Sequence, residues 1–266
     1  MINSFQSSRV TTALRKVPEI TISFWLIKLL TTAMGEVFSD FLVRHLPAML
    51  AVALGGIGFV VAIGLQFSVR RYIPWVYWLL VVMVAIFGTM AADIVHSALG
   101  VPYLISTLGF ILALALVFSV WYRSEKTLSI HSITTPRREL FYWAAVIATF
   151  ALGTAAGDLT ARTVQLGYFT SGVMFTAVIA LIWLAYWRFG LNEVPAFWSA
   201  YILTRPLGAS FADWMGHDQS AGGLGFGTGQ VSLALTIAIV IAVGYLSFID
   251  AKRQGVLRPT PEGERV

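Results

Sequence analysis

Residues 24–40 read FWLIKLLTTAMGEVFSD, and the pattern of this stretch occurs three more times in the 266-residue chain. The later copies read YWLLVVMVAIFGTMAAD at 77–93, YWAAVIATFALGTAAGD at 142–158 and FWSAYILTRPLGASFAD at 197–213. In every copy a tryptophan is followed after ten residues by a glycine and after fifteen residues by an aspartate. Four copies, whose tryptophans are 53, 65 and 55 residues apart, indicate an internal repeat.

The composition is typical of a membrane protein. Hydrophobic residues make up 58% of the chain and charged residues 12%, which is about half the charged share of a soluble domain. A bilayer core of about 30 Å requires about 20 apolar residues per helix, and eight segments meet this requirement. They are residues 21–43, 48–69, 74–97, 101–122, 140–161, 167–188, 196–215 and 228–249. We therefore expect an all-α integral membrane protein with eight transmembrane helices, folded as one membrane domain over residues 1–266.

Each repeat is expected to contain one helix with the motif and one plainer helix, over about 17–71, 72–124, 135–189 and 192–250. Because each repeat crosses the membrane twice, the copies are parallel and related by an axis near the membrane normal. A second small residue four positions after each motif glycine lets helices approach closely. The motif helices are thus expected to form an inner cluster. Their tryptophans, each preceded by Phe or Tyr, are interpreted as an aromatic belt at the membrane interface.

The basic residues predict the orientation. Of the 18 lysines and arginines, fourteen fall in or beside loops on one side of the predicted membrane, and only Arg44 and Arg162 fall on the other. Positive residues collect on the cytoplasmic side, so both termini are expected in the cytoplasm and the protein in the bacterial inner membrane, surrounded by the lipid bilayer. Cations scattered over short loops argue against a nucleic-acid partner. Because the chain has no cysteine, thiolate metal sites are excluded.

Charged and polar residues recur inside the predicted spans, where an ionisable side chain usually serves a function. The acids are Glu36, Asp40, Asp93, Asp158 and Asp213, and the bases are Lys28 and Arg205. Threonines stand on the same helix faces, four or eight residues before an aspartate: they are Thr32, Thr89 and Thr154. If all these groups ionise, the bundle carries three surplus negative charges, which requires protons on some acids or a bound cation. In the simpler alternative the acids face outer water, and Asp40 pairs with Arg44.

We predict from this pattern a transporter of a small, divalent metal cation, coupled to protons. The expected metal ligands are Glu36, Asp40, Asp93, Asp158 and Asp213, with His96 one turn beyond Asp93. Oxygen ligands favour Mn²⁺ or Mg²⁺, and His96 would extend the range toward Zn²⁺, Co²⁺ or Ni²⁺. Lys28 and Arg205 would balance charge when the site is empty. We expect no enzyme activity and no covalent cofactor. A cation channel and a non-transporting scaffold or sensor are the alternatives, and a homo-oligomer is left open.

Two irregular segments lie near the last motif. Pro206 removes a backbone donor from its helix, which predicts a kink and leaves open an unwound segment whose carbonyls face an ion. The stretch 216–229 contains many glycines and is interpreted as a flexible outer lid or a plain linker, with His217 and Asp218 as optional ligands.

The tandem two-span unit with its shared tryptophan resembles a bacterial membrane-protein family that is defined by this repeat. The matching stretches are the four copies quoted above, and together with their partner helices they cover most of the chain. This family has no assigned function. The resemblance therefore implies the repeat architecture and a bacterial origin, but no substrate and no catalytic residue.

Overall fold

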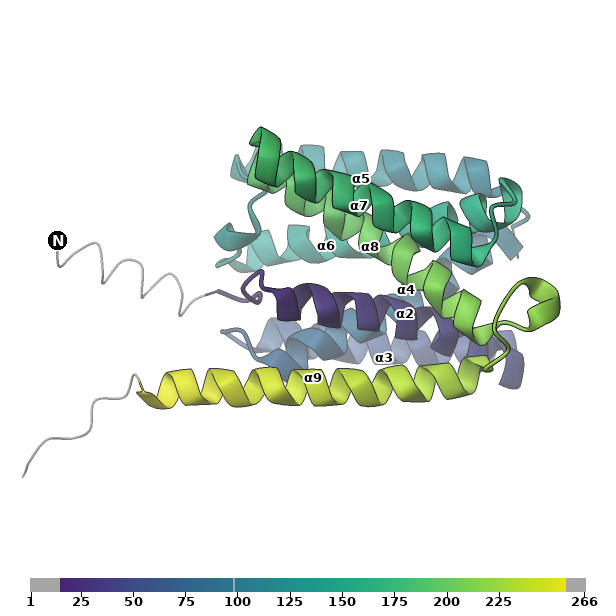
Figure 1. Ribbon diagram of the computed structural model, residues 1–266. Helices are drawn as coiled ribbons and strands as arrows, with labels where there is room; N and C mark the ends of the chain where they lie inside the picture. Colours follow the sequence, from purple (N-terminus) through teal and green to yellow (C-terminus); the bar gives the residue numbers. More distant parts are fainter. Residues whose placement is uncertain (1–14, 98, 257–266) are drawn as a thin grey trace, which may run out of the picture.

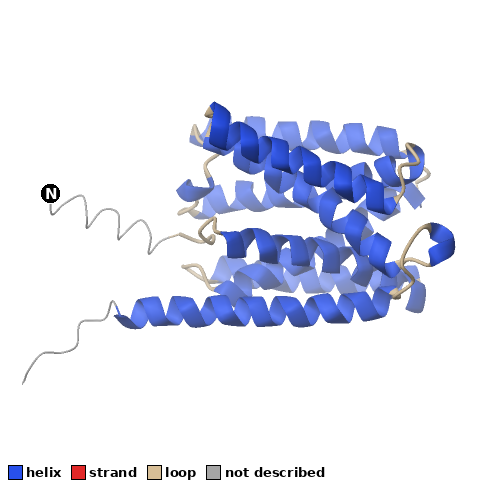
Figure 2. Ribbon diagram, in the orientation of Figure 1, coloured by secondary structure: helices blue, strands red, loops and turns tan. Residues whose placement is uncertain are grey.

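The computed structural model describes residues 15–97 and 99–256, and this part of the chain forms eight long helices and no strand (Figure 2). The helices are α2 (Ile22–His45), α3 (Ala48–Ser68), α4 (Pro74–Ser97), α5 (Tyr103–Glu125), α6 (Pro136–Asp158), α7 (Tyr168–Phe189), α8 (Glu193–Gly216) and α9 (Thr228–Val256). A π-helical turn, η2 (Leu159–Thr163), extends α6, and short turns η1 (Ile130–Ser132) and η3 (Gln219–Ala221) lie in loops. Arg9, Arg258 and Arg265, three of the cations used to predict orientation, lie outside the described residues.

The predicted all-α fold is confirmed, and six of the helices are long and apolar enough to cross a membrane. These six are α3, α4, α5, α6 with η2, α7 and α9. The other two, α2 and α8, have 24 residues each but carry five of the charged residues predicted inside the spans: Lys28, Glu36, Asp40, Arg205 and Asp213. The start of α2 and the end of α9 lie at the same end of the bundle (Figure 1).

The helix starts follow from local chemistry. The side chains of Thr21, Thr135 and Asn192 each accept a hydrogen bond from a backbone amide in the first turn of α2, α6 or α8, as helix-capping residues do. Proline occupies the first position of α4 and α6, where no helical hydrogen bond is lost.

The four motif helices form a closed ring in which every motif glycine lies against the next motif helix. The four contacts join Gly35 to Ala85, Gly88 to Phe150, Gly153 to Arg205 and Gly208 to Thr32. Each partner is the seventh residue after its own motif tryptophan, so the four contacts are equivalent. The ring therefore runs α2, α4, α6, α8 and back to α2, with parallel helices related by a pseudo-fourfold axis. The predicted inner cluster is confirmed.

The plainer helices surround this ring, and each covers the inner helix of the following repeat. Helix α3 packs on α4, α5 on α6, α7 on α8, and α9 on α2, whereas contacts within a repeat are few. About a fifth of the spanning part of α3, α5, α7 and α9 is buried, against more than half of α4 and α6. Because α9 of the last repeat covers α2 of the first, the outer layer also closes the ring.

The close contact at Gly153 gives a direct test of the ring. A Cβ atom there would overlap the side chain of Arg205 and would lie 2.9 Å from Cδ of Pro206, so Gly153→Ala is expected to destabilise the bundle by about 1–3 kcal/mol. At Gly109 of α5 a Cβ atom would meet no other atom within 4 Å. Gly109→Ala should therefore leave the thermal midpoint of the purified protein unchanged or slightly raised. Equal effects of the two substitutions would contradict the ring.

The interpretation of the motif tryptophans as an interfacial belt is wrong for three of the four, whereas Trp25 of the first repeat is partly exposed. Trp78 and Trp143 are each 1% exposed and Trp198 is 4% exposed, and the indole N–H of Trp198 donates to the carbonyl of Leu128 at 2.9 Å. The close helix contacts bring the starts of the four inner helices together on the axis, so these rings face one another instead of lipid. We call this group the aromatic layer; it consists of Phe24, Tyr77, Trp78, Tyr142, Trp143, Phe197, Trp198 and Tyr201.

Helix α8 continues through Pro206 without an unwound segment. The proline packs on the small-residue face of α6, where its ring lies beside Gly153 and its Cα atom lies 3.7 Å from the position of a Cβ atom on Gly157. An unwound ion-binding segment at Pro206 is therefore not part of this fold.

Candidate functional site

The buried polar groups of the interior are stacked in layers along the ring axis. Lys28 lies next to the aromatic layer and is 1% exposed. Its Nζ atom lies 4.3 Å from the ring centre of Phe150 and 4.4 Å from that of Tyr201, and no described residue accepts a hydrogen bond from it. The amino group of Lys28 thus lies over two aromatic faces, which attract its N–H groups. Lys28 is thus placed on the axis, but away from the predicted acidic ligands.

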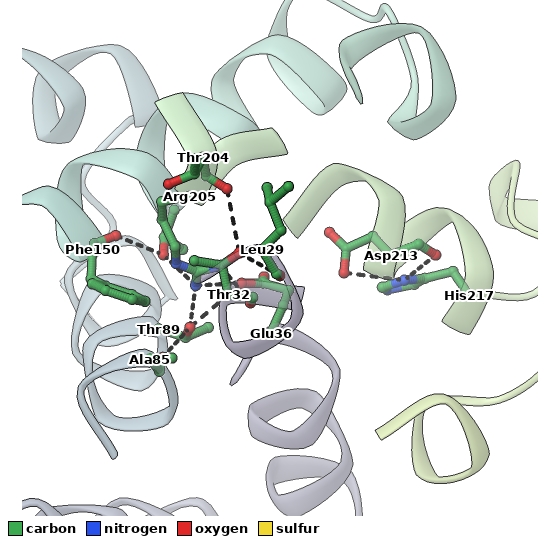
Figure 3. Close-up of polar contacts among 11 residues, drawn as sticks. Leu29, Thr32, Glu36, Ala85, Thr89, Phe150, Thr204, Arg205, Asp213 and His217 are labelled. Atoms are coloured by element: carbon green, nitrogen blue, oxygen red, sulfur yellow. Dashed lines mark hydrogen bonds and ion pairs between the residues drawn. The ribbon is translucent and has the colours of Figure 1, made fainter. Parts of the chain in front are cut away.

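Arg205 and Glu36 form the next layer (Figure 3). The guanidinium of Arg205 is fully buried, and its Nη2 donates to Oε2 of Glu36 at 2.6 Å. Nη2 also donates to the hydroxyl oxygens of Thr89 and Thr154, the latter at 2.9 Å, and Nη1 donates to the carbonyl of Thr32 at 3.3 Å. The three predicted threonines thus surround Arg205. The expected charge balance at Arg205 takes the form of a direct ion pair with Glu36.

The four motif aspartates lie beyond this layer, at the end of the bundle opposite the aromatic layer. Glu36 acts electrostatically on all four of them, so the acids from the four repeats converge on one region. Asp158 and Asp213 are buried, while Asp40 and Asp93 are partly exposed. The ring explains this convergence, because equivalent positions of parallel helices lie at one level.

The surplus of negative charge is smaller than the sequence predicted. Arg162 lies 3.0 Å from Asp158, and Arg44 lies 3.8 Å from Asp40. Both arginines stand four residues after an aspartate, so the helical register brings them over the carboxylates. If all these groups ionise, adding the two arginines to Lys28 and Arg205 sets four positive charges against five acids, so one negative charge is left. The alternative in which Asp40 pairs with Arg44 is therefore partly right: the pair forms, but Asp40 also lies beside His217.

His217 joins Asp40 and Asp213 in a group whose ligand atoms lie within 4.8 Å of one another. Its Nε2 is 3.6 Å from Asp40, and its Nδ1 is 3.1 Å from the carbonyl oxygen of Asp213. A carbonyl only accepts, so Nδ1 carries the proton and Nε2 has a free lone pair. Metal-binding histidines are commonly oriented in this way.

The surroundings hold His217 in place and keep it neutral. The ring stacks on Tyr168 with centres 5.0 Å apart, and the side chain is 11% exposed. Burial lowers the pKa of His217 from its usual value, and the nearby guanidinium of Arg44 lowers it further. A neutral imidazole is the form that binds a metal.

The glycine-rich loop after α8 is folded back onto the helix end, so it is neither a plain linker nor a loose lid. Its backbone amides bond to the last turn of α8 and to His217; they belong to Leu224, Gly225 and Phe226. Gly222, Gly225 and Gly227 have φ angles of 82°, 79° and 82°, which glycine adopts without strain. The many glycines therefore serve the turn that positions His217. Asp218 is exposed and lies outside the group.

A small pocket lies between the group and Glu36. Its walls include Glu36, Asp158, Ser210 and Asp213, and its volume is about 10 Å³, enough for about one water molecule or one bare ion. Within the described residues, the hydroxyl of Ser210 and Oδ1 of Asp213 are buried without a hydrogen-bond partner. Unsatisfied buried oxygen atoms destabilise a fold unless something binds them, so this pocket adds oxygen atoms next to the three-residue group.

His96 lies near this region but is not part of the three-residue group. Its Nδ1 bonds to the carbonyl of Val101 at 2.8 Å, and its ring stacks on Tyr103 with centres 3.5 Å apart. It acts electrostatically on Asp158. The imidazole beside the aspartates is thus that of His217, which we had predicted only as an optional ligand, and not that of His96.

Comparison with known proteins adds the family and nothing on activity. The family model described as Repeat of Unknown Function (DUF347) matches four times, over residues 23–72, 76–127, 141–191 and 196–251. These ranges agree with the four repeats predicted from the tryptophan motif. No curated protein and no solved structure matches the chain.

Proposed function

Because this chain belongs to the family of the Repeat of Unknown Function (DUF347), whose description assigns no activity, we propose a function from the chemistry of the site. The protein is a membrane transporter of a small divalent metal cation and is coupled to protons. In this proposal all eight long helices cross the bacterial inner membrane. Both termini face the cytoplasm, and the acidic end of the bundle faces outward.

The group of Asp40, Asp213 and His217 carries the proposal. Two carboxylates and one imidazole, from the inner helices of the first and last repeats and the loop after α8, present ligand atoms within 4.8 Å of one another. Asp158 and Glu36 line the adjoining pocket and supply further oxygen atoms, while Asp93 and His96 belong to the surrounding shell. All these ligands must be deprotonated to hold a metal, so binding and release exchange protons for the cation.

The ligand types narrow the choice of ion. Carboxylates suit Mn²⁺ and Mg²⁺, whereas imidazole nitrogen suits transition metals. A site with both favours Mn²⁺ over Mg²⁺ and accepts Zn²⁺, Co²⁺ or Ni²⁺ more readily than the oxygen ligands alone would.

The contents of the axis favour a transporter over a cation channel. A continuous path for cations would pass Arg205, then Lys28, and then the aromatic layer, in which the hydroxyls of Tyr77 and Tyr142 lie 2.5 Å apart. The buried positive charge of Arg205 repels a free cation, and the buried side chains of Lys28 and the aromatic layer fill the axis beyond it. Movement of the ion therefore requires a conformational change, which is the property of a transporter.

Flux into proteoliposomes tests this function. Uptake of Mn²⁺ is expected to saturate with concentration, to respond to an imposed proton gradient, and to fall at least tenfold in Asp40→Asn. The matched control, Asp218→Asn, removes an exposed acid of the neighbouring loop and should transport normally. Unitary currents in planar bilayers would instead identify a channel. Binding of Mn²⁺ without uptake would identify a sensor or scaffold.

A further inference from the structure

Three oxygen atoms from three different helices surround a single nitrogen of Arg205. Oε2 of Glu36 and Oγ1 of Thr154 lie 2.6 and 2.9 Å from Nη2, and Oγ1 of Thr89 is also in contact with it. Glu36, Thr89 and Thr154 belong to α2, α4 and α6, and each is the eleventh residue after its motif tryptophan. These three oxygens, which we call the axial cage, are therefore related by the pseudo-fourfold axis.

The fourth repeat supplies a cation to this level instead of a ligand. Its eleventh residue is Ala209, which has no side-chain oxygen, and four residues earlier the same helix carries Arg205. The guanidinium thus lies among the side-chain oxygens that the other three repeats place at this level. The one carboxylate of the cage matches its single positive charge.

The axial cage offers more acceptors than the Nη2 atom of Arg205 has protons. The hydroxyl of Thr89 donates its proton to the carbonyl of Ala85 at 2.7 Å, and that of Thr154 donates to the carbonyl of Phe150 at 3.1 Å. Both hydroxyl oxygens therefore face Nη2 as acceptors, together with a carboxylate. Nη2 has two protons for three acceptors. A spherical cation has no such limit, and hard oxygen ligands of this kind are those that alkali and alkaline-earth ions prefer.

We propose that the axial cage is a cation site whose resident is the guanidinium of Arg205, and that a free monovalent cation, Na⁺, binds there when this side chain is removed. The resident guanidinium keeps the axis closed between the acidic end and Lys28. This inference rests on the cage alone and does not depend on transport of a divalent metal.

The test is the thermal stability of Arg205→Ala, which keeps the Cβ atom next to Gly153. We expect Tm of this variant to be higher by roughly 2–4 °C or more in sodium chloride than in choline chloride of equal concentration. Low millimolar guanidinium should produce a similar rise, since it restores the missing group. Wild-type protein and Arg205→Ala/Glu36→Gln should show no such difference, and Arg188→Ala, which removes an exposed arginine, is the matched control.

The response of the variants to the three salts supports or overturns the cation site. Recovery of folded Arg205→Ala in sodium or guanidinium but not in choline also supports the cage. Identical behaviour in all three salts, whether the variant folds or not, overturns it. A sodium response of Arg205→Ala in a protein that never binds Mn²⁺ would retain the cage and reject the proposed transport.

Discussion

Replacing Glu36 by Gln is expected to destabilise the protein by about 3–5 kcal/mol, because it leaves the buried guanidinium of Arg205 without its carboxylate. The pair is 2.6 Å apart, with side chains 0% and 8% exposed, so bulk water compensates little of the lost charge. In detergent the thermal midpoint should fall by about 10 °C.

The matched control is Glu193→Gln. Glu193 pairs with His131 at 3.3 Å, but its side chain is 58% exposed, and exposed pairs contribute about 0–1 kcal/mol. The midpoint of this variant should stay within about 2 °C of wild type. Equal midpoints for the two variants would mean that the pair of Arg205 and Glu36 does not support the ring.

The second large effect is expected at Asp213. We expect Mn²⁺ to raise the thermal midpoint of the wild-type protein, and Asp213→Asn to abolish this rise, because the substitution removes one of two carboxylates of the group and puts an amide nitrogen beside His217. A hundredfold excess of ligand over Kd contributes about 2.7 kcal/mol, so the rise to be lost is several degrees.

The paired control is Asp218→Asn, which keeps the Mn²⁺ response because Asp218 is exposed and outside the group. The response should weaken in acid, where protons compete with the metal for its ligands. A full Mn²⁺ response in Asp213→Asn would place the metal elsewhere.

Periodicity and repetition predicted most of the fold. Apolar length located all eight helices, and the fourfold motif predicted parallel repeats with inner and outer helices, since small residues every four positions need a close neighbour. The sequence did not predict that each inner helix is covered by the outer helix of the previous repeat, because the plainer helices carry no motif that indicates which helix they pack against. The buried tryptophans were misassigned for a related reason: a tryptophan near a helix start suits an interface or a core equally well.

The site was predicted in its residue types and only partly in its contacts. The register of Glu36, Thr89 and Thr154 indicated one polar level, but their common partner Arg205 depends on how a long side chain bends across the axis. Pairing of Arg44 with Asp40 was considered as an alternative, but Arg162 was taken only for an orientation signal, although its spacing of four from Asp158 was the same visible sign of pairing. We predicted His217 only as an optional ligand because its position depends on how the following loop folds. The glycines of this loop were a sign of tight turns, and three of them do adopt positive φ angles.

The most direct measurement is the binding of Mn²⁺ to the purified protein, followed by pulsed electron paramagnetic resonance. We expect about one tightly bound Mn²⁺ per chain, with a nitrogen coupling from one imidazole that disappears in His217→Ala and persists in His96→Ala. Loss of the coupling in His96→Ala, or the absence of any stoichiometric Mn²⁺ binding to the wild-type chain, would contradict a divalent cation site between Asp40, Asp213 and His217.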